Sequence, residues 1–176
     1  MRYFLVIFVF VTFHLHAEIY KLALPSDSGM KFYWWPVLPN VAGWHHDRDH
    51  SIHYGANAQA PDGYTFANAE TVIYASAVFK PRVPDIKSLK GFIENDQAKF
   101  ESTADVVIKR KDIMLTSDGS ELESFTFFPA GKGNWEQVAY GEEGDYYLVF
   151  TVSSRSKDGF EKSWGAYEQF VKNYKM

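Results

Sequence analysis

The sequence predicts an α+β domain in which helices pack against a meandering antiparallel β-sheet, as in an α/β/α sandwich. Two amphipathic helical patterns alternate with runs of strand-forming residues, in the order strands, helix, four strands, helix. Short turn sequences at residues 117–120 and 141–144 join neighbouring strands as hairpins, which makes the sheet antiparallel. No internal repeat or interdomain linker interrupts residues 18–176, so we expect a single domain there.

The first 17 residues are expected to be a secretory signal peptide that precedes this domain. Arg2 is followed by an uncharged apolar run from Tyr3 to Phe13. Such a run fits the ~7–15 residues of a signal's hydrophobic region and is shorter than the ~18 needed to span a bilayer. Ala17 supplies the small residue that signal peptidase requires. We therefore expect cleavage after it and a periplasmic or secreted protein with no membrane insertion; the alternatives are an uncleaved anchor or a first core strand.

The chain between the signal and the first regular strand is expected to be irregular. Residues 18–63 are rich in Pro, Gly, Trp and His, and contain one short aromatic run, Phe32–Trp35. The segment Thr71–Phe79 is β-branched and apolar on both faces, which is typical of a central strand. Pro81 ends that strand.

Two helices are expected, over residues 86–102 and 157–174, and each carries one apolar stripe. Asp85 is the expected N-cap of the first helix and Ser156 that of the second. The stripe of the first helix contains Leu89, Phe92, Ile93 and Phe100, and that of the second contains Phe160, Trp164, Tyr167, Val171 and Tyr174.

Four strands are expected between these helices, over residues 106–115, 121–128, 135–140 and 146–153. Asp118-Gly119 in the first connection is a strong hairpin-turn signal. In the last strand Leu148, Phe150 and Val152 share one face, because side chains alternate along a strand.

Composition excludes several classes of protein. The chain has no cysteine, so it forms no disulfide and carries no lipid-modified N-terminal cysteine. Its net charge of −4 and the absence of a basic run argue against nucleic acid and anionic membrane surfaces as partners.

Several segments of the chain match the pattern of a known family. They are Gly43-Trp44 with Asp47, Pro61-Asp62-Gly63, Ser88–Phe100, Val138–Tyr140, and the closing run from Ser153-Ser154-Arg155 through Phe160 to Tyr174. On these segments the sequence resembles the PsbP/Mog1-like α/β/α sandwich domains. In its particular residues it resembles an uncharacterised set of small exported bacterial proteins. The resemblance covers most of residues 18–176. It implies a non-catalytic accessory or binding role by analogy of fold, and supplies no catalytic residues.

A histidine cluster is the first candidate site. The histidines outside the expected signal are His45, His46, His50 and His53, with Asp47 and Asp49 among them. Imidazole and carboxylate are ligands for Zn²⁺, Cu²⁺ or Ni²⁺. In a helix His46, His50 and His53 would share a face, whereas in an extended chain His46 and His50 would share a side. The alternatives are a pH-responsive patch and an ordinary polar surface loop.

Asp96 is the second candidate, because it falls in the middle of the first helix's apolar stripe. A carboxylate that faces the sheet needs a hydrogen-bonded or cationic partner. It is either a buried acid for general acid–base chemistry or, as we favour, a structural anchor.

The leading hypothesis is a non-enzymatic exported domain that binds a protein or small-molecule ligand and needs no cofactor. Trp44, Asp47 and Asp96 are the expected ligand-binding residues, in a cleft between the sheet and the Trp44–His53 loop. The alternatives are a periplasmic protein that binds a divalent transition metal through the histidines, and a small hydrolase that uses Asp96 or Ser154.

Overall fold

The computed structural model describes residues 18–27, 29–103 and 105–176. The expected signal peptide, residues 1–17, lies outside the described residues. Within the described part of the chain, no helix is both long enough and apolar enough to cross a membrane.

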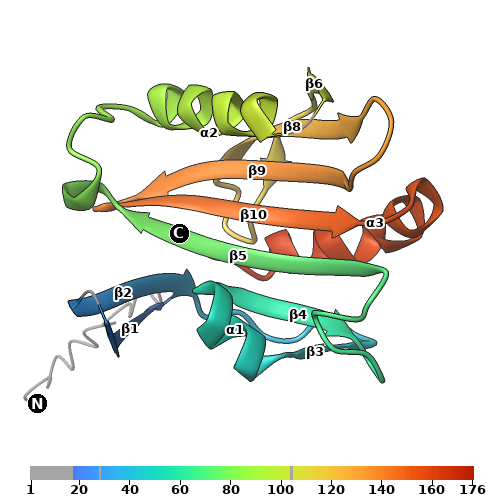
Figure 1. Ribbon diagram of the computed structural model, residues 1–176, viewed down its shortest axis with the longest axis horizontal. Coiled ribbons are helices and arrows are strands. Elements are labelled where there is room, and N and C mark those ends of the chain that lie inside the picture. The colour runs from blue at the N-terminus through green and yellow to red at the C-terminus, as the bar shows by residue number, and fades with distance from the viewer. Residues whose placement is uncertain (1–17, 28, 104) are drawn as a thin grey trace, which may run out of the picture.

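One large antiparallel sheet forms the centre of the molecule (Figure 1). Every strand pair in it is antiparallel. The strands, in spatial order, are β3 (Trp44–His46), β4 (Asn57–Pro61), β5 (Thr71–Phe79), β10 (Tyr146–Ser154), β9 (Trp135–Glu143), β8 (Glu121–Pro129) and β6 (Val106–Arg110), with β7 (Met114–Leu115) also paired to β8. The predicted α+β class with an antiparallel sheet is confirmed.

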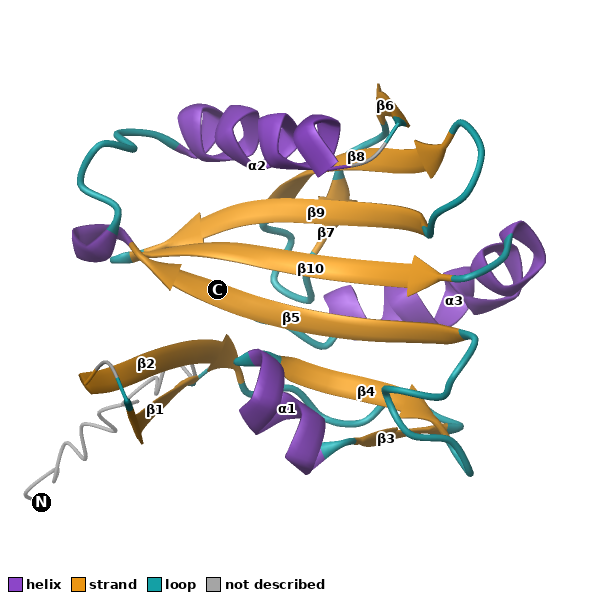
Figure 2. Ribbon diagram, viewed as in Figure 1, coloured by secondary structure: helices purple, strands orange, loops and turns teal. Residues whose placement is uncertain are grey.

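Helices cover the two faces of the sheet unequally (Figure 2). Helix α3 (Lys157–Lys172) lies across what we call the back face. Helix α2 (Leu89–Thr103) covers the β8 and β9 side of the front face, and α1 (Arg48–Tyr54) covers β4 on the same face. A short 3₁₀ helix, η1 (Lys80–Arg82), leads from β5 towards α2. The middle of the front face, over β5 and β10, therefore lies between two helices.

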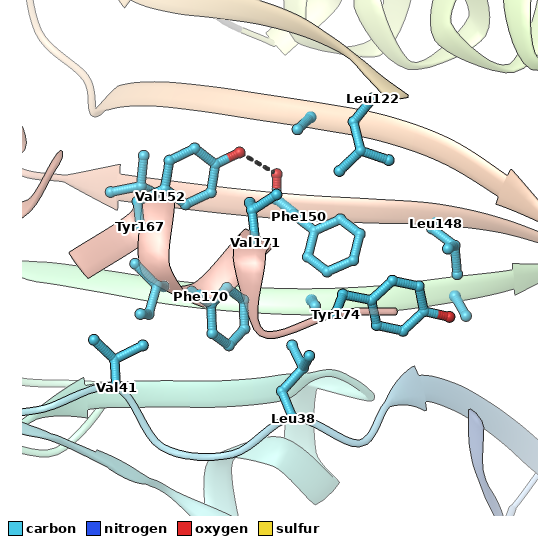
Figure 3. Close-up of a cluster of buried hydrophobic side chains, with 14 of the residues drawn as sticks. Leu38, Val41, Leu122, Leu148, Phe150, Val152, Tyr167, Phe170, Val171 and Tyr174 are labelled. Carbon is cyan, nitrogen blue, oxygen red and sulfur yellow. Dashed lines mark hydrogen bonds between the residues drawn. The ribbon is translucent and has the colours of Figure 1, made fainter. Parts of the chain in front are cut away.

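The back face carries the larger core (Figure 3). The aromatic stripe of α3 packs on Leu148, Phe150 and Val152 of β10, and the Tyr167 hydroxyl donates a 2.9 Å hydrogen bond to the Phe150 carbonyl. A smaller core lies beneath α2 on the front face, where Phe92 stacks on Tyr147 with ring centroids 4.6 Å apart. Helix α3 begins as predicted, since Ser156 Oγ accepts a hydrogen bond from Gly159 N.

The expectation of an irregular region over residues 18–63 is wrong. This region forms the hairpin of β1 (Ile19–Ser26) and β2 (Gly29–Pro36), followed by β3, α1 and β4. These elements depend on contacts with distant parts of the chain, such as the packing of Trp34 on Phe79, so local sequence patterns do not indicate them.

Two predicted boundaries also differ from the structure. Helix α2 begins at Leu89 and Ser88 Oγ accepts a hydrogen bond from Gly91 N, so Asp85 is not its cap. Residue 85 instead lies in a turn closed by a hydrogen bond from Ile86 N to the Val83 carbonyl.

The strand expected over residues 106–115 is interrupted. Arg110 pairs with Phe125 whereas Met114 pairs with Leu122, so this strand has one more residue than β8 between the two pairs. The extra residue makes a β-bulge, which divides the segment into β6 and β7.

Candidate ligand-binding groove

The floor of the groove is the front face of β5, β10 and β9. Because side chains alternate along a strand, the residues between the back-face core positions all point forward. On β10 these include Val149, Thr151 and Ser153, and the last two stand opposite Tyr74 and Val72 of β5. Ser153 also stands opposite Glu136 of β9. Polar side chains thus occupy the middle of the front face, where the back face has Phe150 and Val152.

The walls of the groove come from the two helices that flank this floor. On one side, Tyr54 at the end of α1 and Phe66 of the loop between β4 and β5 border a cavity of about 420 Å³ with Glu136 at its floor. On the other side, α2 borders a second cavity of about 300 Å³ that includes Asp96. Tyr74 and Ser76 line both cavities, so the two lie side by side over β5 and β10, and we refer to them together as the front-face groove.

Glu136 is the half-buried carboxylate of the groove floor. Ser153 Oγ donates a 2.5 Å hydrogen bond to Glu136 Oε1, and the Asn134 amide donates both to Ser153 Oγ, at 3.1 Å, and to the same carboxylate. Burial raises the pKa of Glu136; these hydrogen bonds oppose the rise, and the negative charge of Asp96 adds to it. Glu136 and its two hydrogen-bonding partners thus come from β9, β10 and the loop between β8 and β9.

Aromatic rings form the wall beside Glu136. The rings of Tyr54 and Phe66 lie 5.3 Å apart, and those of Phe66 and Tyr74 lie 5.7 Å apart in an edge-to-face arrangement. Tyr54 is 55% exposed although it is a large aromatic residue. The rings therefore line an open corner of the groove rather than a filled core.

Two of the predicted site residues, Asp47 and His50, lie behind this wall and support it. Asp47 Oδ1 accepts a hydrogen bond from His50 N at the start of α1, and its Oδ2 accepts one of 2.9 Å from Phe66 N. The His50 ring packs on both Tyr54 and Phe66, and its Nδ1 lies 2.8 Å from Asp47 Oδ2. Although partial burial opposes the change, the hydrogen bonds from Phe66 and His50 hold the pKa of Asp47 below its usual value.

The structure does not bring the four histidines together. His45 faces Asp62, with Nδ1 3.6 Å from Oδ1, whereas His46 Nε2 lies 2.8 Å from Ser51 Oγ. His50 supports the aromatic wall and His53 packs edge-on against Tyr54. Among the described residues, no group of three or more His, Asp or Glu side chains is arranged to hold a metal ion. His45 and His46 lie in strand β3, whereas His50 and His53 lie in helix α1. The histidine segment is therefore neither wholly helical nor wholly extended, the two cases considered in the sequence analysis.

The other predicted residues lie in different places. Trp44 packs at the margin of the back-face core and is not among the residues that line the groove. Ser154, the alternative nucleophile, is buried on the back face and accepts a 2.8 Å hydrogen bond from Thr71 Oγ1. Neither side chain has access to the groove.

Asp96 faces the sheet from α2, as its place in the apolar stripe predicts. It is half-buried, and its Oδ2 accepts a 2.7 Å hydrogen bond from the hydroxyl of the fully buried Tyr140. The expected partner is thus present, although it is a tyrosine rather than an arginine or a backbone amide. Burial and the adjacent Asp96 charge together raise the pKa of Tyr140 well above its usual value, so this hydroxyl stays protonated.

Three groove residues were not among the predicted site residues: Glu136, Tyr74 and Ser76. A signal for Glu136 is nevertheless present: it shares a strand face with Val138 and Tyr140, which both lie in the front-face core. An acidic residue in register with two buried residues points at the sheet's covered face.

No family model and no curated protein matches this chain.

Proposed function

We propose that this protein is an exported, non-enzymatic domain that binds a small organic ligand in the front-face groove. The observation that carries the proposal is the open groove over β5 and β10, which neither α1 nor α2 fills. Ligand sites commonly have volumes of about 300–1,000 Å³ and combine apolar walls with a few convergent polar groups. The aromatic wall, Glu136 and Ser153 have this composition.

The groove also supports a small molecule rather than a protein as the ligand. Its polar groups lie on the floor of a concavity, and small-molecule sites are typically concave. The proposal includes no metal because the four histidines are dispersed, and no nucleic-acid partner because the net charge is negative.

A titration with a groove-filling variant tests the proposal. Isotopically labelled residues 18–176 are mixed with small-molecule sets of cationic, neutral and anionic compounds, and amide chemical shifts are recorded. Binding is expected to shift the amide signals of Tyr74, Ser76 and Thr151. The Ser76→Phe variant, which places a ring where the two cavities meet, is expected to abolish these shifts.

Glu101→Phe is the matched control, because Glu101 is exposed on α2 and does not line the groove. It should bind as the wild type does. Absence of groove shifts with every compound set, or binding that persists in Ser76→Phe, would contradict the proposal. Export is tested separately: protein from the periplasm or medium should begin at Glu18, and a protein retained in the cytoplasm with Met1 intact would refute it.

A further inference from the structure

We infer that the ligand is an organic ammonium ion, with its cationic nitrogen held between Glu136 and the aromatic wall. This inference rests on the proposed function and names the chemical class of ligand for the same groove.

The charge on the groove floor is the first argument. The Glu136 carboxylate has two hydrogen-bonding partners, Ser153 and Asn134, and both are neutral. The nearby carboxylate of Asp96 adds a second negative charge. A carboxylate that is partly removed from water and has only neutral partners is energetically unfavourable. A cationic ligand would supply the missing opposite charge and would bind the ionised form of Glu136.

The aromatic wall is the second, independent argument. Cations bind to the faces of aromatic rings, and ammonium groups are often recognised by several rings set at angles to one another. Phe66 meets Tyr74 at an interplanar angle of 71° and Tyr54 at 42°, so the three rings line a corner rather than a flat stack. The same cavity contains Glu136. Rings and carboxylate together are complementary to a positively charged nitrogen with attached carbon.

The positive side chains of the groove do not occupy this position. Arg155 is exposed at the rim, where its guanidinium donates a 2.6 Å hydrogen bond to the Ala67 carbonyl. Lys99 belongs to α2 and lines the second cavity, not the one that contains Glu136. The charged residues that line this cavity are Glu136, Glu70 and Arg155, so two of the three are negative. A cation is therefore the better match to the floor.

The second cavity indicates what the ammonium group is attached to. Its lining next to α2 is largely apolar and includes Val78, Val83, Ile86, Phe92, Phe100 and Val149. Because Tyr74 and Ser76 line both cavities, this apolar region is adjacent to the cavity that contains Glu136. The structure thus favours an amine with a hydrocarbon extension over a bare ammonium ion.

Calorimetric titration with four compounds of one chain length tests this inference. Hexylamine and hexyltrimethylammonium carry the cation, hexanol is the neutral analogue and hexanoate the anionic one. Both cations are expected to bind the wild-type domain at least tenfold more tightly than hexanol or hexanoate. Glu136→Gln should reduce cation affinity at least tenfold and leave hexanol affinity unchanged. Phe66→Leu should weaken hexyltrimethylammonium more than hexylamine.

Glu121→Gln is the control, because it removes the same charge from an exposed position that does not line the groove. It should bind all four compounds as the wild type does. Equal binding of hexanol or hexanoate, or unchanged cation binding in Glu136→Gln, would overturn the inference. If all four compounds fail while another compound shifts the groove amides, only the ligand class is wrong; if none does, the proposed function fails as well.

Discussion

The two faces of the central sheet are built from the same strands and differ in what covers them. On the back face, Leu148, Phe150 and Val152 of β10 are buried beneath α3 with the remaining members of a large aromatic core. On the front face, the alternating residues Thr151 and Ser153 lie at the floor of an open groove. The alternation of side chains along one strand therefore separates a stabilising surface from a candidate binding surface.

This difference indicates how stability is distributed in the molecule. With no disulfide, the domain depends on buried apolar area, and most of that area lies on the back face. The front face keeps polar and half-exposed aromatic groups whose burial would require a partner. We therefore expect back-face substitutions to affect folding and groove substitutions to affect binding.

The largest expected effect contrasts two phenylalanines. Phe170→Ala should lower the free energy of unfolding by about 3–5 kcal/mol, because Phe170 is fully buried beneath the sheet and its removal leaves a cavity. Phe66→Ala, in the half-exposed groove wall, should cost only about 1 kcal/mol. Urea denaturation measures both values. Similar losses at the two positions would contradict the division between the faces.

A second contrast lies within helix α3. Gly159→Ala should destabilise by about 1–3 kcal/mol, because a β-carbon there would lie 2.6 Å from Ser154 Oγ and 2.8 Å from Thr71 Oγ1. Gly165→Ala, in the same helix, meets no atom within 4 Å and should stabilise by up to about 1 kcal/mol. Thermal unfolding of both variants checks this prediction. A stabilising Gly159→Ala would show that the first turn of α3 is not tightly packed on β5.

The third prediction concerns the hydrogen bond that ties α2 to the front face. Asp96→Ala should cost about 1–2 kcal/mol, because it leaves the buried Tyr140 hydroxyl without its acceptor. In a double-mutant cycle, Tyr140→Phe should reduce the cost of Asp96→Ala, since no buried hydroxyl then remains. Chemical denaturation of the four proteins measures the coupling. A loss below about 0.5 kcal/mol in Asp96→Ala would mean that this carboxylate is hydrated and not an anchor.

The sequence predicted the regions where local pattern and tertiary structure agree. Periodicity located both long helices, and Asp118-Gly119 located the hairpin of which β8 is the second strand. The hairpin β1–β2 was missed because its strands are held by aromatic contacts such as that of Tyr20 on Trp35 rather than by alternation. The side-chain amide of Asn57, at the start of β4, likewise donates a hydrogen bond to the carbonyl of Pro36, at the end of β2.

The groove was only partly predictable for a related reason. Tyr74 and Ser76 were missed because the other residues of Thr71–Phe79 are mostly small or β-branched. Such a sequence predicts a strand that is apolar on both faces and does not indicate which face is polar. Asp96 was found because one helix stripe defines its surroundings. The hairpin of β9 and β10 was predicted, but its register was not, and it is the register that brings Ser153 opposite Glu136.

The smallest expected effect concerns the pH dependence of the groove floor. Burial raises the pKa of Glu136 in the folded protein, against the opposing hydrogen bonds from Ser153 and Asn134. The folded state therefore binds this proton more tightly than the unfolded state, and the associated stability is lost as pH rises through the raised pKa. The Glu136→Gln variant has no such loss. Its free energy of unfolding relative to wild type should therefore increase as the pH rises above the pKa of glutamate in the unfolded chain. At neutral pH the gain should be about 0.5 kcal/mol, within the usual range for stabilising substitutions.

Urea denaturation between acidic and neutral pH measures this difference, with Glu121→Gln as the control that should show none. Asp47 contributes with the opposite sign, because its lowered pKa makes the folded state lose stability as pH falls, but it is common to both proteins and cancels in the comparison. A Glu136→Gln variant that is less stable than wild type at neutral pH would mean that the ionised carboxylate stabilises the fold. A variant that is more stable yet binds ammonium ligands poorly is the expected signature of a residue retained for binding at the expense of stability.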